Sequence, residues 1–129
     1  MISESIRTIL TADVDVDTAV SSRIYAHIAT INTAFPLIVY NVSSFSPVET
    51  KDSPSILDIH DFNVNVYSKT LLEAGDISSK VRLALERYSG TVNSHVIQSI
   101  QLLSVQELYE SEQNIYRIIL SFSLRECKS

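Results

Sequence analysis

The chain has 129 residues, of which 45% are hydrophobic and 19% charged, and its formal net charge is −5 at pH 7. This length predicts a single domain over residues 1–129 with a core that needs no disulfide bonds. The excess of acids argues against a domain that grips nucleic acid through its phosphates, since such a domain needs a basic face. With two glycines, Gly75 and Gly90, the chain lacks the glycine-rich turns of Rossmann and P-loop phosphate sites.

Signals for secretion or membrane insertion are missing from the sequence. The single cysteine, Cys127, cannot form an internal disulfide, and the first residues lack the pattern of a signal peptide. No apolar run approaches the ~20 residues that span a bilayer. We therefore expect a protein that folds in the cytoplasm and has no membrane partner.

The first residues carry apolar side chains at helical spacing: Ile2, Ile6, Ile9 and Leu10. They predict a short amphipathic helix over 3–11. Aspartates then stand at 13, 15 and 17, as at the start of a calcium-binding loop, but Thr18 replaces the glycine and Ile24 the glutamate that the loop requires. We predict a polar turn instead, in which Asp17 caps a helical turn over 18–21.

Two strands are predicted next, over 23–28 and 35–42, and the second has β-branched residues in series. Residues 43–58 include two prolines and predict either a long irregular loop or a hairpin arm with Phe45 and Val48 pointing to a partner. Irregular loops longer than ~12–15 residues are usually functional or disordered. This stretch is therefore a candidate contact region.

The middle of the chain predicts a strand followed by the longest helix. Residues 61–67 alternate apolar and polar side chains, so that one face of the strand is buried. Thr70 and Glu73 then fit a capping box at the start of a helix. Gly75-Asp76 is an alternative start, and Gly90 is expected to end the helix.

Two further strands, over 95–105 and 115–125, are predicted with a polar connection over 106–114. The resulting fold class is α+β. We expect a mostly antiparallel β-sheet, one long amphipathic helix packed across it, and a short N-terminal helix.

Chemistry-bearing residues are scattered. The candidate metal ligands show none of the paired spacings of metal motifs, and they are His27, His60, His95 and Cys127. His60 and Asp61 are neighbours on a predicted strand and so point to opposite faces. We expect no metal, no cofactor, no catalytic residue and no enzymatic activity.

The order and spacing of several segments carry a resemblance to a known family. These segments are Arg23-Ile24-Tyr25, Phe35-Pro36 with the apolar strand that follows, the alternating strand Phe62-Asn63-Val64-Asn65-Val66-Tyr67-Ser68, the helix around 77–85, and the closing strand from Tyr116 to Arg125. Over roughly residues 6–125 the chain resembles the tail-completion proteins of long-tailed bacteriophages, also called tail-terminator or tail-to-head joining proteins.

The resemblance implies a structural virion protein without cofactor or catalysis. Such proteins form a ring, typically a hexamer, at the head-proximal end of the tail tube. The ring ends tube polymerisation and docks the neck or head-completion proteins. Genomic DNA passes through its lumen without specific binding. The implied location is the virion tail near the neck, after assembly in the host cytoplasm.

The side chains that we expect at contacts with other subunits or the tube are Phe45, Val48, Glu49, Lys51, Asp52, Arg117 and Arg125. The arginines have an equal claim to be solubilising residues of a half-exposed sheet. Two other functions stay open. One is a stopper ring of the neck, and the other is a small ligand-binding regulatory domain, which needs a pocket lined by polar groups.

Overall fold

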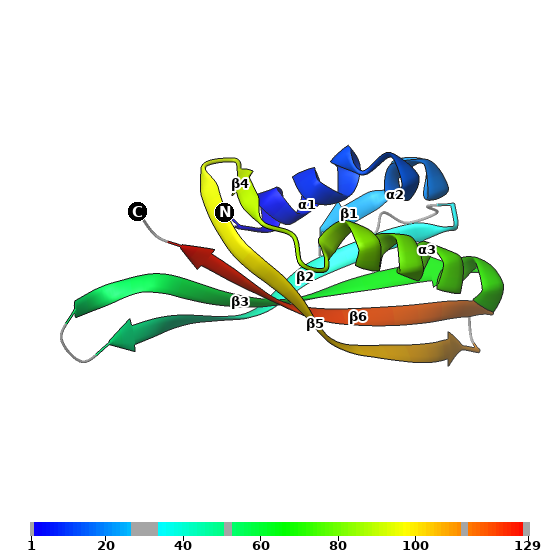
Figure 1. The fold of residues 1–129 in the computed structure, drawn as a ribbon. Helices are drawn as coiled ribbons and strands as arrows, with labels where there is room; N and C mark the ends of the chain where they lie inside the picture. Colours follow the sequence, from blue (N-terminus) through cyan, green and yellow to red (C-terminus); the bar gives the residue numbers. More distant parts are fainter. Residues whose placement is uncertain (1, 27–33, 51–52, 112–113, 128–129) are drawn as a thin grey trace.

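The computed structural model describes residues 2–26, 34–50, 53–111 and 114–127, with side chains described outside 46–56 (Figure 1). The helices are α1 (Ile2–Ala12), α2 (Val14–Ala19) and α3 (Leu71–Leu85). The strands are β1 (Ile24–Ala26), β2 (Leu37–Thr50), β3 (Ser53–Ser68), β4 (Gly90–Val92), β5 (His95–Glu110) and β6 (Ile115–Cys127). The predicted α+β class is confirmed.

The strands form one curled sheet in the order β1-β2-β3-β6-β5-β4. The β1–β2 pair is parallel, and the other neighbouring strands are antiparallel. Figure 1 shows α1, α2 and α3 together on one face of this sheet. The helical layer therefore contains the predicted N-terminal helix α1 and also α2 beside α3, so one long helix does not cover the sheet alone.

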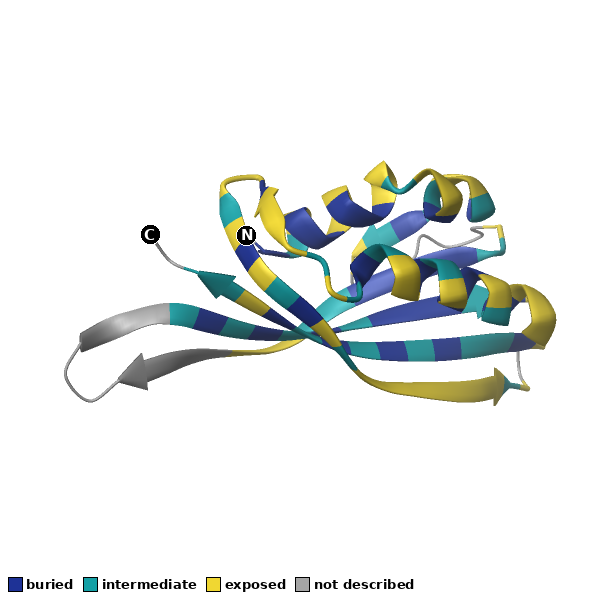
Figure 2. Cartoon of the chain, viewed as in Figure 1, coloured by how far each residue is buried: buried dark blue, intermediate teal, exposed yellow. Residues whose placement is uncertain are grey.

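The core lies between that helical layer and the central strands. Alternate residues of β3 and β6 are buried, and the Phe62 and Phe122 rings stack with centroids 5.3 Å apart. Ile6 of α1 and Val81 of α3 are fully buried in the same apolar cluster. Each buried side chain of this size stabilises the fold by about 1.5–3 kcal/mol. Figure 2 shows the resulting alternation of buried and less buried residues along β6.

The helix boundaries differ from the prediction in two places, at the start of α2 and at the end of α3. Asp13, not Asp17, caps α2, because its carboxylate accepts the Val16 N–H at 3.1 Å. Helix α3 begins after Thr70, as the capping box predicted, and it continues through the alternative start at Gly75-Asp76. It ends at Leu85 rather than near Gly90, since Arg87 takes a left-handed φ of 64° and donates its N–H to the Ile100 carbonyl at 2.8 Å.

The strand boundaries differ as well. Strand β5 continues to Glu110, so much of the predicted polar connection is strand. Gly90 begins β4, a three-residue strand that the sequence did not predict.

None of the described helices is long and apolar enough to cross a bilayer.

Candidate functional site

The 43–58 stretch is a hairpin arm in the structure. Strands β2 and β3 stay paired from Leu37↔Tyr67 to Thr50↔Ser53, with register shifts after Val42 and Val48. Figure 1 shows this hairpin leaving the body beyond the helical layer. The long irregular loop is therefore not the conformation of this stretch.

One of the expected contact residues of the arm has a described side chain. Phe45 is 53% exposed, and its ring lies 5.0 Å from the His60 ring across the hairpin. The side chains of Val48 and Glu49, and all of Lys51 and Asp52, lie outside the described residues. About half of the Phe45 side chain is thus exposed at the base of the arm.

Arg117 lies in a polar network on the sheet face opposite the helices. Its guanidinium donates two hydrogen bonds to Asn65 Oδ1, at 3.1 and 2.9 Å, and lies 3.5 Å from a Glu110 oxygen. It also stands 5.5 Å from the Tyr67 ring centroid. Burial raises the pKa of Tyr67, Arg117 opposes that rise, and Glu110 adds to it. Arg117 is therefore bound within its own chain, whereas Arg125 on the same strand is exposed.

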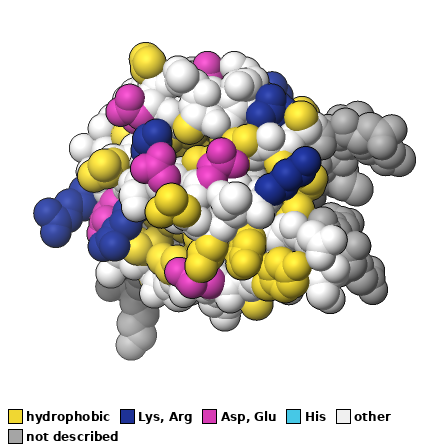
Figure 3. All heavy atoms as spheres, turned by 90° about the vertical axis from the view of Figure 1, so that its right-hand side faces the viewer, with side chains coloured by type: hydrophobic (Ala, Val, Ile, Leu, Met, Phe, Trp, Pro, Cys, Tyr) yellow, Lys and Arg dark blue, Asp and Glu magenta, His cyan; other side chains and the backbone are white. Residues whose placement is uncertain are grey.

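The end of β5 forms an exposed apolar edge. Four large side chains here are between 44% and 54% exposed, and they are Leu103, Val105, Leu108 and Tyr109. Among the described residues, β4 pairs with β5 at 95–97, so the later part of β5 has β6 on one side and no strand on the other. Figure 3, which views the end of the molecule where β5 finishes, shows hydrophobic side chains gathered in the lower part of that face.

A hollow of another kind lies on the outer side of α3. It is lined by Leu71, Leu72, Gly75, Asp76 and Ser79. Leu72 is 88% exposed there, and one carboxylate is present among mainly apolar atoms. This lining is not the convergent set of polar groups that a small-ligand pocket requires.

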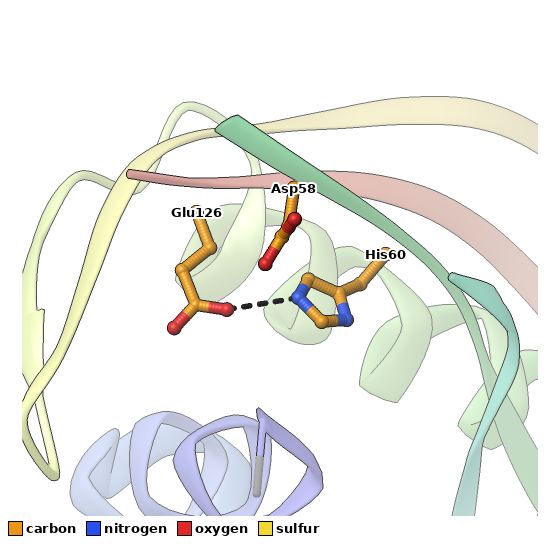
Figure 4. A group of neighbouring side chains, drawn as sticks. All are labelled: Asp58, His60 and Glu126. Carbon is orange, nitrogen blue, oxygen red and sulfur yellow. Dashed lines mark hydrogen bonds and ion pairs between the residues drawn. The ribbon is translucent and has the colours of Figure 1, made fainter. Parts of the chain in front are cut away.

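A cluster of titratable side chains lies at the base of the arm (Figure 4). Asp58 and His60 of β3 are 4% and 7% exposed. The His60 Nε2 atom is 2.9 Å from one oxygen of Glu126, and His95 Nδ1 is hydrogen-bonded to the other oxygen. Burial favours the neutral acid at Glu126, but the hydrogen bonds and the electrostatic attraction of His95 and His60 together lower the pKa of Glu126.

Sequence reasoning missed this cluster. His60 and Glu126 are separated by 66 positions along the chain, so no local spacing indicates their contact. The available signal was the alternation of side chains along two strands. Asp58 and His60 lie on one face of β3, and Glu126 lies on the same face once β6 is aligned with β3. Of the other predicted ligands, Cys127 follows Glu126 on the opposite face of β6, and His27 lies outside the described residues.

Comparisons with known proteins agree on the fold. A chain of a solved structure, the virion of a native gene transfer agent particle, has 17% sequence identity and a TM-score of 0.83, and the alignment covers 96% of this chain and 92% of that one. A second solved chain has 10% sequence identity and a TM-score of 0.63, and the alignment covers 98% of this chain and 96% of that one. Among curated proteins, none matches the sequence at a significant level.

The family model of tail completion protein gp17 matches residues 4–126. This match spans α1 to β6 and confirms the resemblance noted in the sequence. It supports a structural component of a phage-type tail. The chain belongs to the tail completion protein gp17 family.

Proposed function

We propose that copies of this chain form a ring, a hexamer by resemblance, at the head-proximal end of a phage tail tube. The ring ends tube polymerisation and joins the tail to the neck proteins of the head. It acts by geometry: one face takes up the contacts of a tube subunit, and the other cannot recruit another tube ring. The observation that carries this proposal is the exposed apolar edge of β5.

This edge has the properties of an assembly surface. The later part of β5 presents backbone N–H and C=O groups on its outer side, and such a row is a template for pairing with another chain. Its exposed apolar side chains, which lie on both faces of the strand, add contact area. A strand edge that meets a different surface of the next copy forms a heterologous contact, which closes into a ring when the rotation allows.

The arm supplies a second contact in this proposal. It projects from the body, so it reaches a neighbouring copy or the tube without displacing the core.

Genomic DNA passes through the lumen without specific binding, in keeping with a net charge of −5 on each chain.

The proposal is tested by measuring mass with light scattering, for the chain alone and mixed with purified tail-tube protein. We expect a ring-sized species, alone or on tube ends. Val105→Lys together with Leu108→Lys places two charges on the edge and should abolish that species. Leu83→Lys is the matched control, because Leu83 is 84% exposed on α3, away from the edge.

Rings of wild-type size from the double variant would contradict the role of the edge. A chain that stays monomeric and ignores the tube would contradict the terminator function itself. Binding to purified neck protein in that case would favour a stopper ring of the neck.

A further inference from the structure

We propose that Asp58, His60 and Glu126 bind a divalent first-row transition metal at the base of the arm. The sequence predicted no metal site, because its candidate ligands are far apart along the chain. The fold brings these three side chains together, and the arrangement is independent of the ring proposed above.

Strand register creates the site. Asp58 pairs with Glu126 and His60 pairs with Leu124, and β3 and β6 have no register shift along their shared length. Residues two apart on a strand share a face, so the three side chains stand on the same side of the sheet. Figure 4 shows them converging there, on the side of the helices. One donor atom from each lies within 4.8 Å of the others.

The donor set suits a borderline divalent cation. Two carboxylate oxygens and one imidazole nitrogen are ligands for zinc, manganese or cobalt. Bond lengths of about 2.0–2.2 Å place donors around one ion roughly 3–4 Å apart, so small side-chain rotations are enough to bind it. The cation would balance the charge of the two carboxylates and replace the hydrogen bond between His60 and Glu126. Three protein ligands leave further positions for water.

The surroundings already orient the ligands. His95 holds the second oxygen of Glu126, as outer-shell hydrogen bonds commonly do in metal sites. The hairpin that carries His95 is attached to α1, since Ser5 donates to the Val92 carbonyl at 3.1 Å. The Phe45 ring lies beside the His60 imidazole, 5.0 Å away. These contacts restrict the ligand rotamers before any ion arrives, which favours binding.

The first test uses the full wild-type chain after treatment with a chelator and dialysis. Calorimetric titration with Zn²⁺ and with Mn²⁺, and visible absorption on addition of Co²⁺, should each show one ion per chain. The midpoint of thermal unfolding should rise by roughly 5–10 °C at a free metal concentration of about 100 Kd. Absence of saturable binding for all three ions would overturn the proposal.

Variants locate the ion. Asp58→Asn, His60→Asn and Glu126→Gln should each weaken binding by about 100-fold or more, and His95→Ala by about 10–100-fold through the loss of orientation. Asp61→Asn is the matched control. This variant removes one carboxylate charge from the residue that directly follows His60 on β3. The Asp61 carboxylate lies on the opposite face of the strand and accepts a hydrogen bond from the Ser44 hydroxyl, so the metal affinity should stay unchanged.

Equal affinity in Asp58→Asn and the wild type would contradict the site, and so would a loss in Asp61→Asn as large as in Asp58→Asn. Circular dichroism separates loss of binding from loss of fold. Should a ligand variant unfold, the wild type still decides the matter, because bound Co²⁺ or Mn²⁺ must broaden the imidazole signals of His60. Sharp His60 signals in the presence of saturating ion would overturn the assignment.

Discussion

At the residue scale, Asn65 links three strands of the open sheet face. It is 4% exposed, donates to the Val39 carbonyl of β2 at 3.0 Å, and accepts both hydrogen bonds from Arg117 of β6. An amide offers donors and an acceptor at once, so a single side chain satisfies groups on both neighbouring strands. Arg117 is positioned by this amide.

Replacing Asn65 with alanine should therefore lower the free energy of unfolding by about 2–3 kcal/mol, since bonds to a charged group are among the stronger ones. Asn63→Ala is the control on the same strand and face, because Asn63 accepts one neutral bond, from Ser121 at 2.8 Å. We expect a loss of about 1 kcal/mol there. Urea unfolding of both variants measures the difference, and equal losses would show that the Arg117 bonds add nothing.

At the element scale, the start of α3 shows how a predicted cap is altered by its context. Thr70 accepts the Glu73 N–H at 3.2 Å, as a capping box requires. The Glu73 carboxylate instead accepts the Ser68 hydroxyl at 2.5 Å, and the same hydroxyl accepts the Thr70 N–H at 3.3 Å. Ser68 is fully buried at the end of β3, so the cap also joins the helix to the sheet.

Glycine at position 75 weakens this helix without serving a visible contact. A Cβ atom built there meets nothing within 4 Å. Gly75→Ala should stabilise the protein by about 0.5–1 kcal/mol, because alanine loses less backbone entropy in a helix. Gly90→Ala is the opposing control, since Gly90 has a φ of 150° that L side chains rarely adopt. Thermal unfolding should show a higher midpoint for the first variant and a lower one for the second, and a fall for Gly75→Ala would contradict this account.

The elements that the sequence predicted well have one buried face. Strands β3 and β6 alternate strictly because their even-numbered residues line the core, and α3 has apolar positions at helical spacing for the same reason. The end of β5 has no buried face, so its residues, among them Gln106 and Glu107, do not alternate between apolar and polar, and the sequence predicts a connection there. The His60–Glu126 contact depends on strand register across the whole chain, which a single sequence does not display.

At the scale of the whole molecule, the structure divides into a packed body and a projecting arm. The core residues belong to the body, whereas β2 and β3 continue together into the arm. Substitutions in the arm therefore leave the core residues unchanged. The exposed edge of β5 is likewise separate from the core, since its large exposed side chains are not core residues.

Deletion of residues 47–54 should consequently leave a folded chain that fails to assemble. Its far-ultraviolet circular dichroism and cooperative unfolding should match those of the wild type, because the core clusters lie outside the deleted segment. Ring formation and virion yield should fall, as measured by light scattering and by plating of phage that carry the deletion. Normal virions would remove the arm from the assembly mechanism.

The unbroken pairing of β3 with β6 has a mechanical consequence. β3 is a single strand of 16 residues, about 50 Å long when extended. Its later half lies in the sheet between β2 and β6, beneath α3, while its earlier half forms one side of the arm. Such a strand behaves as a beam fixed at one end. A force on the arm would therefore act directly on the strand beneath α3, because β3 has no break in its register with β6 between the two.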